Sequence, residues 1–184
     1  MINNHSQSLF LHKYIFSMKI QIMILWILSV IFTGCSSQNT DDSEQIQTDI
    51  KAIKMVLENY KISINQADTV LAGSFWLTTP QASFIHPRGH EKGWKAIKSG
   101  IYEMFGSRFT TRNLKSYNET IQLHGDLAVV EFYWIFNATL SGENPTPMQT
   151  RGRETIVMSK IENNWKIVHI HYSGMPVTGE REGF

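Results

Sequence analysis

Glu154 is the side chain best placed in this sequence for proton-transfer chemistry. Between Arg151 and Lys160 it shares a two-residue alternation with Ile156 and Met158. In a strand, it would therefore point into an apolar core. Burial disfavours the charged form of a carboxyl group and raises its pKa, so Glu154 could act as a general base. The alternative is a structural glutamate that pairs with His86 or with an arginine.

Two histidines flank the tripeptide Pro87-Arg88-Gly89. His86 and His90 could stand at the mouth of a binding pocket, where an imidazole would shuttle protons or anchor a polar group. His86 is thus a second candidate catalytic residue, and His90 is a candidate pocket residue. The alternative is a pair of exposed loop histidines.

His169 and His171 are separated by one residue and would point to the same face of a strand. Two imidazoles on one face could begin a zinc or copper site, with Glu131 as the same-face acid. A hydrogen-bonded polar layer is the preferred interpretation, with Glu131, Arg153 and Ser173 as partners, so no metal is expected. No cofactor is expected, and the sequence has no phosphate-binding glycine loop. A nucleophilic triad is not expected either, because no serine lies in a nucleophile-elbow pattern.

Three helices are expected before any long strand. Apolar residues at spacings of four and three predict a first helix over residues 46–64, with Thr48 or Asp49 as its N-cap. Asp68 is expected to cap a second helix that runs through Trp76. The third helix is expected from about residue 92 to residue 105, with Gly106 at its C-terminal end.

Strands follow the helices, and they position the candidate residues. The expected strands are 83–86, 112–123, 127–140, 151–160 and 165–173. Alternation predicts one apolar face, made by Ala128, Val130, Phe132, Trp134, Phe136, Ala138, Ile156, Met158, Val168, Ile170 and Tyr172. The other face is too polar for a core and could pair with a second subunit. Helices followed by an antiparallel meander indicate an α+β domain with its helices on one sheet face.

The C-terminal strands carry a family resemblance. The sequence of residues 154–157, followed by Asn164-Trp165-Lys166-Ile167-Val168-His169-Ile170-His171-Tyr172-Ser173-Gly174-Met175-Pro176, resembles the SnoaL-like group. That group belongs to the nuclear transport factor two-like superfamily, and the match is close to the association domain of calcium/calmodulin-dependent protein kinase II. The resemblance covers residues 46–177. It implies a cone-shaped fold, with three N-terminal helices on a curved, mainly antiparallel sheet, a pocket at the wide end, and a homodimer.

The resemblance also suggests what the pocket would hold. The arginines that line the kinase pocket fall on Phe136, Ile156 and Tyr172 here, and a histidine of that pocket falls near Ile97. We therefore expect an apolar pocket lined by Trp76, Ile97, Ile101, Trp134, Phe136, Ile156 and Tyr172, which suits a small apolar ligand. Superfamily members also include isomerases, cyclases and dehydratases, so an enzyme and an oligomeric scaffold remain alternative functions.

The N-terminal residues predict a signal peptide for export and lipid attachment. Residues 20–32 are apolar and follow Lys19, and Phe32-Thr33-Gly34-Cys35 resembles a bacterial lipobox. The expected organisation is a signal peptide over residues 1–34, of which 1–17 precede a second candidate start at Met18. A lipidated Cys35 with a polar tether to residue 47 would follow, then a domain over 48–178 and a tail over 179–184. The protein would be anchored by lipid in the cell envelope, with the outer membrane favoured. The alternative is an N-terminal membrane anchor.

Composition narrows the function classes. The chain has 184 residues, 17 basic and 16 acidic side chains, and one cysteine. Removing residues 1–34 removes Lys13 and Lys19 and no acids, which leaves 15 basic and 16 acidic residues and a net charge of −1. Such a chain lacks the basic surface of a nucleic-acid binder and a polybasic membrane patch. A single cysteine also excludes a disulfide framework.

Overall fold

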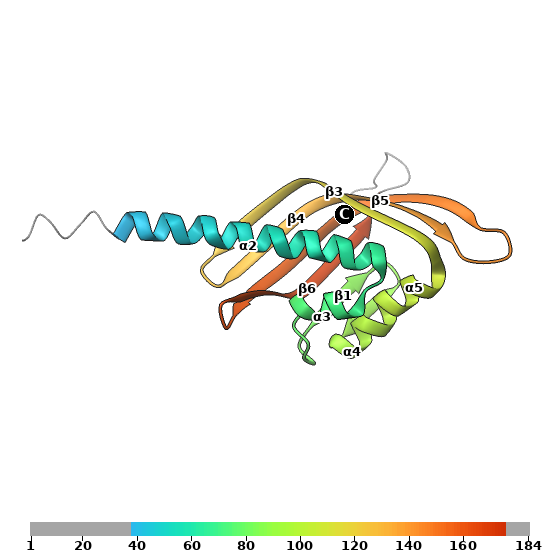
Figure 1. The fold of residues 1–184 in the computed structure, drawn as a ribbon, viewed down its shortest axis with the longest axis horizontal. Helices are drawn as coiled ribbons and strands as arrows, with labels where there is room; N and C mark the ends of the chain where they lie inside the picture. Colours follow the sequence, from blue (N-terminus) through green and yellow to red (C-terminus); the bar gives the residue numbers. More distant parts are fainter. Residues whose placement is uncertain (1–37, 176–184) are drawn as a thin grey trace, which may run out of the picture. The chain divides into compact units, whose positions relative to one another are not determined.

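The computed structural model describes residues 38–175, in which two helices, two short strands and a further helical stretch precede four long strands (Figure 1). The helices are α2 (Gln38–Gln66), α3 (Thr69–Phe75), α4 (Trp94–Ile97), the π-helical segment η1 (Lys98–Glu103) and α5 (Met104–Arg108). A compact unit begins at Ile46. Cys35, the expected signal peptide and the tail lie outside the described residues. No helix within residues 38–175 is long and apolar enough to cross a bilayer.

The strands form one mixed sheet with the order β2-β1-β6-β5-β4-β3. Their bounds are β1 (Ser83–His86), β2 (Gly89–Lys92), β3 (Phe109–His124), β4 (Leu127–Leu140), β5 (Thr146–Ile161) and β6 (Asn164–Gly174). Each neighbouring pair is antiparallel except β1 and β6, which are parallel. The sheet is thus mainly antiparallel, as predicted. The turn between β3 and β4 uses Gly125 at a φ of 60°, a conformation that glycine adopts without strain.

The helices cover one face of this curved sheet (Figure 1). Helix α2 buries four hydrophobic side chains at helical spacing, Ile53, Leu57, Tyr60 and Ile64. The prediction that Thr48 or Asp49 caps this helix is wrong, because the helix already begins at Gln38. Asp49 is instead a buried residue of the helix interior and turns toward the sheet.

The two following helices differ in how well they match expectation. Asp68 is the N-cap of α3, and its carboxylate accepts hydrogen bonds from the backbone N–H groups of Val70 and Leu71. The third helix begins at Trp94 rather than near residue 92, because residues 89–92 pair with β1 as the unpredicted strand β2. It also continues to Arg108, so Gly106 lies inside α5 and is not its cap.

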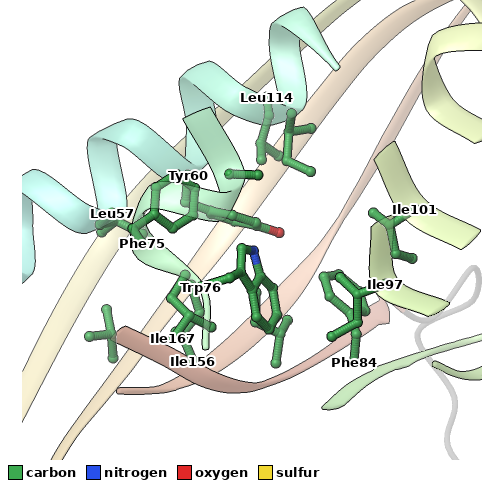
Figure 2. Packing of buried hydrophobic residues seen from close by; sticks show 14 of the residues in the cluster. Leu57, Tyr60, Phe75, Trp76, Phe84, Ile97, Ile101, Leu114, Ile156 and Ile167 are labelled. Atoms are coloured by element: carbon green, nitrogen blue, oxygen red, sulfur yellow. The ribbon is translucent and has the colours of Figure 1, made fainter. Parts of the chain in front are cut away.

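Alternation assigns the inner face of the sheet correctly on β4 and β5. Ala128, Val130, Phe132, Trp134, Phe136, Ala138, Ile156 and Met158 are all buried. On β6 a register shift between Val157 and Met158 adds one residue, so Ile167 fills the core where Val168 was predicted. Beyond this bulge Ile170 and Tyr172 return to the predicted face. Figure 2 shows Leu57, Tyr60 and Trp76 packed with Ile156 and Ile167 in this core.

Candidate functional site

Glu154 is the chemical centre of the core. It lies on β5 between its register partners Phe132 on β4 and Tyr172 on β6, and it is 4% exposed. The Tyr60 hydroxyl, which α2 brings down onto the sheet, donates a hydrogen bond of 2.7 Å to Glu154 Oε1. The partner is therefore Tyr60, and neither His86 nor an arginine fills this position.

Burial makes Glu154 a weaker acid than an exposed glutamate. Desolvation raises its pKa from the ordinary 4.5 to about 8, and the hydrogen bond from Tyr60 lowers it only in part. The pKa of Tyr60 is raised as well, first by burial and then by the negative charge that Glu154 can carry. Near neutral pH the site therefore holds an uncharged carboxylic acid next to an uncharged phenol, and a small change in surroundings would ionise the acid.

A group of hydrogen-bonded side chains continues from Tyr60 toward the third helix. Ser63 donates to the Tyr60 carbonyl at 2.7 Å and to the Tyr102 hydroxyl at 3.3 Å, and Trp76 Nε1 donates to the same hydroxyl at 3.0 Å. Burial raises the pKa of Tyr102 despite these hydrogen bonds. These groups are mutually satisfied, so they hold α2, α3 and η1 in fixed positions around Glu154.

Tyr172 connects Glu154 with the surface through an aromatic wall. Its ring stacks on His86 at a centroid distance of 6.1 Å and meets Phe84 and Trp134 edge-on at 5.8 and 5.7 Å. Burial and the nearby Glu154 raise the pKa of Tyr172, and Arg88 opposes this shift. Tyr172 is only half-buried, so one side of the wall is open to solvent.

The two loop histidines separate in the structure. His86 is buried on the inner face, and its Nε2 lies 3.4 Å from Glu91 Oε1. His90 is exposed and pairs in register with Ile85 on the other face. His86 therefore joins the aromatic wall beside Tyr172, whereas the structure places His90 away from the other candidate pocket residues.

Six of the other candidate pocket residues share one cluster. Trp76, Ile97, Ile101, Trp134, Phe136 and Ile156 are buried together in the hydrophobic core. Trp134 differs from its neighbours in one respect. Within residues 38–175 its indole Nε1 is the buried side-chain nitrogen or oxygen that has no hydrogen-bond partner.

The outer face carries the histidine pair. His171 lies opposite Thr155, Ser173 lies opposite Arg153, and Glu131 follows on β4. His169 Nδ1 lies 2.6 Å from the hydroxyl of Ser83, and burial, His171 and His90 together lower the pKa of His169. No group of three or more metal-ligating residues occurs in the described part of the chain. His169 therefore has Ser83 as its partner, which was not predicted.

An open depression of about 620 Å³ lies elsewhere on the sheet, over β3, β4 and β5. Its outer-face side chains are uncharged, and they include Thr111, Asn113, Asn137, Thr139 and Gln149. Two pairs bond within it, Gln149 to Asn137 at 2.7 Å and Thr111 to Thr139 at 2.8 Å. These residues point away from Glu154, so a molecule bound here would not reach the carboxyl group.

Sequence reasoning missed two members of the site. Tyr60 was counted only as part of an apolar helix face, although a phenol on such a face must place its hydroxyl near a buried partner. The indole N–H of Trp134 was also overlooked, because a tryptophan in an alternating strand indicates burial but not whether its donor is satisfied. A search for polar atoms on apolar faces would have found both.

The chain is similar to a known domain family and to solved structures. A model of the SnoaL-like domain matches residues 44–178. A nuclear transport factor 2-like superfamily protein from Salmonella enterica serovar Typhimurium is 39% identical over 76% of this chain and 99% of that chain, with a TM-score of 0.71. No curated protein matches the chain.

More distant structures share the fold. A protein described as a candidate scytalone dehydratase from Novosphingobium aromaticivorans is 17% identical over 73% of this chain and 89% of its own, with a TM-score of 0.64. A candidate calcium/calmodulin-dependent protein kinase II association domain from Xanthomonas campestris is 17% identical over 68% of this chain and 87% of its own, with a TM-score of 0.56. At these identities the likeness shows the architecture of three helices on a curved sheet and nothing about the ligand.

Proposed function

Because the chain belongs to the SnoaL-like domain family, we propose that it binds a small, largely apolar molecule on the inner face of its sheet, beside Glu154. One observation carries this proposal. Glu154 is a buried acid that lies next to an aromatic wall and is held by one hydrogen bond from Tyr60. A buried ionisable group without a charged partner costs stability, and such groups concentrate at functional sites.

The expected route of entry passes Tyr172 and Gly174. Gly174 pairs in register with Gly152 at the end of β6, and a Cβ atom added to Gly174 would meet nothing within 4 Å. The inner face therefore has open space at this end of the sheet, next to the half-buried Tyr172. An apolar molecule that enters here would lie against the rings of Tyr172 and Trp134.

Ethylbenzene is a suitable probe of this route. We expect saturable binding to the full chain, measured as chemical-shift changes by nuclear magnetic resonance. The variant Gly174→Phe fills the open space and should abolish the binding, whereas Gln122→Phe, at an exposed position of β3, should leave it unchanged. Lack of saturable binding to the unaltered chain, or equal binding by Gly174→Phe, would overturn the proposal.

An enzyme is the second candidate function, and the pKa of Glu154 favours it. A carboxyl group with a pKa of about 8 populates both protonation states near neutral pH, as an acid–base catalyst requires. The reaction would be a cofactor-independent isomerisation, cyclisation or dehydration of an apolar substrate, with Glu154 or His86 as proton carrier. Any such activity that survives in Glu154→Gln would exclude Glu154 from this role.

A scaffold is the third candidate, and the outer face favours it. Tyr117 and Tyr133 are exposed there and stack at 5.6 Å, beside the polar layer of Glu131, Arg153 and His171. This face would pair two copies of the chain into a homodimer. Light scattering should report a dimer that Tyr133→Glu dissociates, and a monomeric unaltered chain would refute this pairing.

The location remains a prediction from the lipobox-like sequence before Cys35. The protein would be tethered by an acylated Cys35 in the cell envelope, on the outer membrane, and the polar residues that link Cys35 to the domain would include the first residues of α2. Mass spectrometry of the purified mature protein tests this directly. An N-terminal residue other than Cys35, or a Cys35 without acyl groups, would refute it.

A further inference from the structure

The indole of Trp134 presents an unused hydrogen-bond donor inside the protein. Its side chain is 6% exposed, and its Nε1 has no partner among the described residues. An unsatisfied buried N–H group costs about 1–3 kcal/mol, and native proteins leave few such groups. A donor of this kind needs an explanation, and a ligand is the one that its surroundings support.

The backbone next to Trp134 is shaped to hold the indole in place. Gly152 is its register partner on β5, and a Cβ atom there would overlap the indole ring and the backbone oxygen of Ser173. Glycine at residue 152 therefore lets the indole lie across β5 toward β6, where it meets Tyr172 edge-on at 5.7 Å.

The same arrangement brings the indole ring of Trp134 to Tyr172, the residue that lies beside Glu154 on β6. Residues 152 and 154 are successive inner-face positions of β5, and Tyr172 is the register partner of Glu154 on β6. Trp134 and Glu154 thus flank one ring, that of Tyr172, from two strands. The space beside Gly174 opens at the same end of the sheet.

We infer that this site binds a ligand with an uncharged hydrogen-bond acceptor, of the ketone or other carbonyl class, whose oxygen accepts from Trp134 Nε1 while its apolar body lies against Tyr172. This inference rests on the proposed function and adds the chemical class of the ligand. An oxygen atom bound in this way would satisfy the indole donor. A neutral carbonyl compound fits better than a carboxylate because an anionic ligand would meet Glu154, which can itself become negative.

Three small probes separate the possibilities. Acetophenone has an aromatic ring and a carbonyl acceptor, ethylbenzene has the ring alone, and benzoate carries a negative charge. In the full chain labelled with ¹⁵N-tryptophan, the five tryptophans give separate indole signals, and the signal absent from Trp134→Phe belongs to Trp134. Trp165→Phe is the matched control, because Trp165 Nε1 already donates to Asp49 at 2.9 Å.

We expect acetophenone to bind about three- to tenfold more tightly than ethylbenzene, the range that one neutral hydrogen bond supplies. The indole proton of Trp134 should move downfield as acetophenone saturates the site. In Trp134→Phe the preference for acetophenone should disappear, and in Trp165→Phe it should persist. The downfield shift in the unaltered chain tests the inference even if Trp134→Phe does not fold.

The opposite results are equally clear. Equal affinity for acetophenone and ethylbenzene, or a shift confined to another indole, would overturn the carbonyl inference and leave the proposed apolar site intact. Tighter binding of benzoate than of acetophenone would overturn the preference for an uncharged acceptor. If none of the three compounds binds saturably, the proposed function fails together with this inference.

Discussion

Two buried regions of this domain contain the same pair of residue types, a carboxyl group and a tryptophan, but treat them differently. In the first region Trp165 Nε1 donates to Asp49 Oδ1 at 2.9 Å, and Lys160 Nζ lies 2.8 Å from the same oxygen. In the second region Glu154 has a phenol as its partner, and the indole of Trp134 has none. In the first region the carboxylate has a cation and the indole has an acceptor. In the second region the carboxyl group has no cation and the indole has no acceptor among the described residues.

The difference separates a region that is fully paired from the region that we propose binds a ligand. Asp49, Lys160 and Trp165 join α2 to the end of β5 and the start of β6, and the Asp49 carboxylate has both a cation and an indole donor there. Glu154 has no such cation within the described residues, so desolvation decides its protonation. Paired donors and acceptors contribute to stability, whereas a buried donor without a partner costs stability.

The largest expected contrast is the pH dependence that Glu154 imposes on stability. Its pKa is raised in the folded protein from 4.5 to about 8, so the folded state binds more protons between these values than the unfolded state does. This contribution of Glu154 to stability is fully present below pH 4.5 and is lost as the pH rises through 8, by an amount on the order of 5 kcal/mol at most.

Urea unfolding of the unaltered chain and of Glu154→Gln, from pH 5 to pH 9, measures this contribution. The amide of Glu154→Gln can still accept from Tyr60 but does not titrate, so the decline in stability should become much shallower. A decline of equal steepness in both proteins would show that Glu154 has an ordinary pKa.

Removing Asp49 from the first region should give the next largest effect on stability. Asp49→Ala removes the acceptor of Trp165 and the counter-charge of Lys160, and we expect a loss of about 2–3 kcal/mol in unfolding free energy. The matched control is Glu58→Ala on the same helix. Glu58 pairs with Lys61 at 2.6 Å but is 61% exposed, so its loss should cost about 0.5 kcal/mol or less. Equal effects of the two substitutions would contradict the structural role of Asp49.

Tyr60→Phe tests the second region, which contains Glu154. It removes the hydrogen bond to Glu154 and should cost about 1–2 kcal/mol. Because that bond lowers the pKa of Glu154, its loss should move the titration of Glu154 to higher pH, as carbon-13 resonance of the carboxyl group can measure. Tyr117→Phe, on the outer face, is the control and should change neither quantity. A lower pKa in Tyr60→Phe would contradict the assigned hydrogen bond.

The sequence predicts the elements of this fold more fully than it predicts the site. Periodicity predicted α2, the third helix and the long strands because each buries one continuous apolar face, and the N-cap signal of Asp68 predicted α3. It missed β2, since Gly89-His90-Glu91-Lys92 has no apolar alternation and forms a strand only by pairing with β1. It also misplaced Val168, because a bulge in the β5–β6 pairing has no signature in the residues themselves.

Glu154 was predicted by its parity, but its surroundings were not. The carboxyl group is held by Tyr60, which is 94 positions away along the chain, and only tertiary packing brings the two together. His86 and His90 look equivalent in sequence, yet the alternation of β1 and β2 sends them to opposite faces. Pairings across long separations therefore had to come from the structure.

The smallest expected effect on stability comes from one atom, the indole Nε1, in the two tryptophans. Trp134→Phe and Trp165→Phe remove the same indole ring segment from two side chains that are 6% and 4% exposed, so the loss of packing should be similar. Only Trp165→Phe also removes a hydrogen bond and leaves Asp49 with one donor fewer. Trp165→Phe should therefore cost about 1 kcal/mol more than Trp134→Phe in urea unfolding. Equal losses would mean that the Trp134 indole bonds to a group as Trp165 does, which would remove the basis for treating it as a donor held for a ligand.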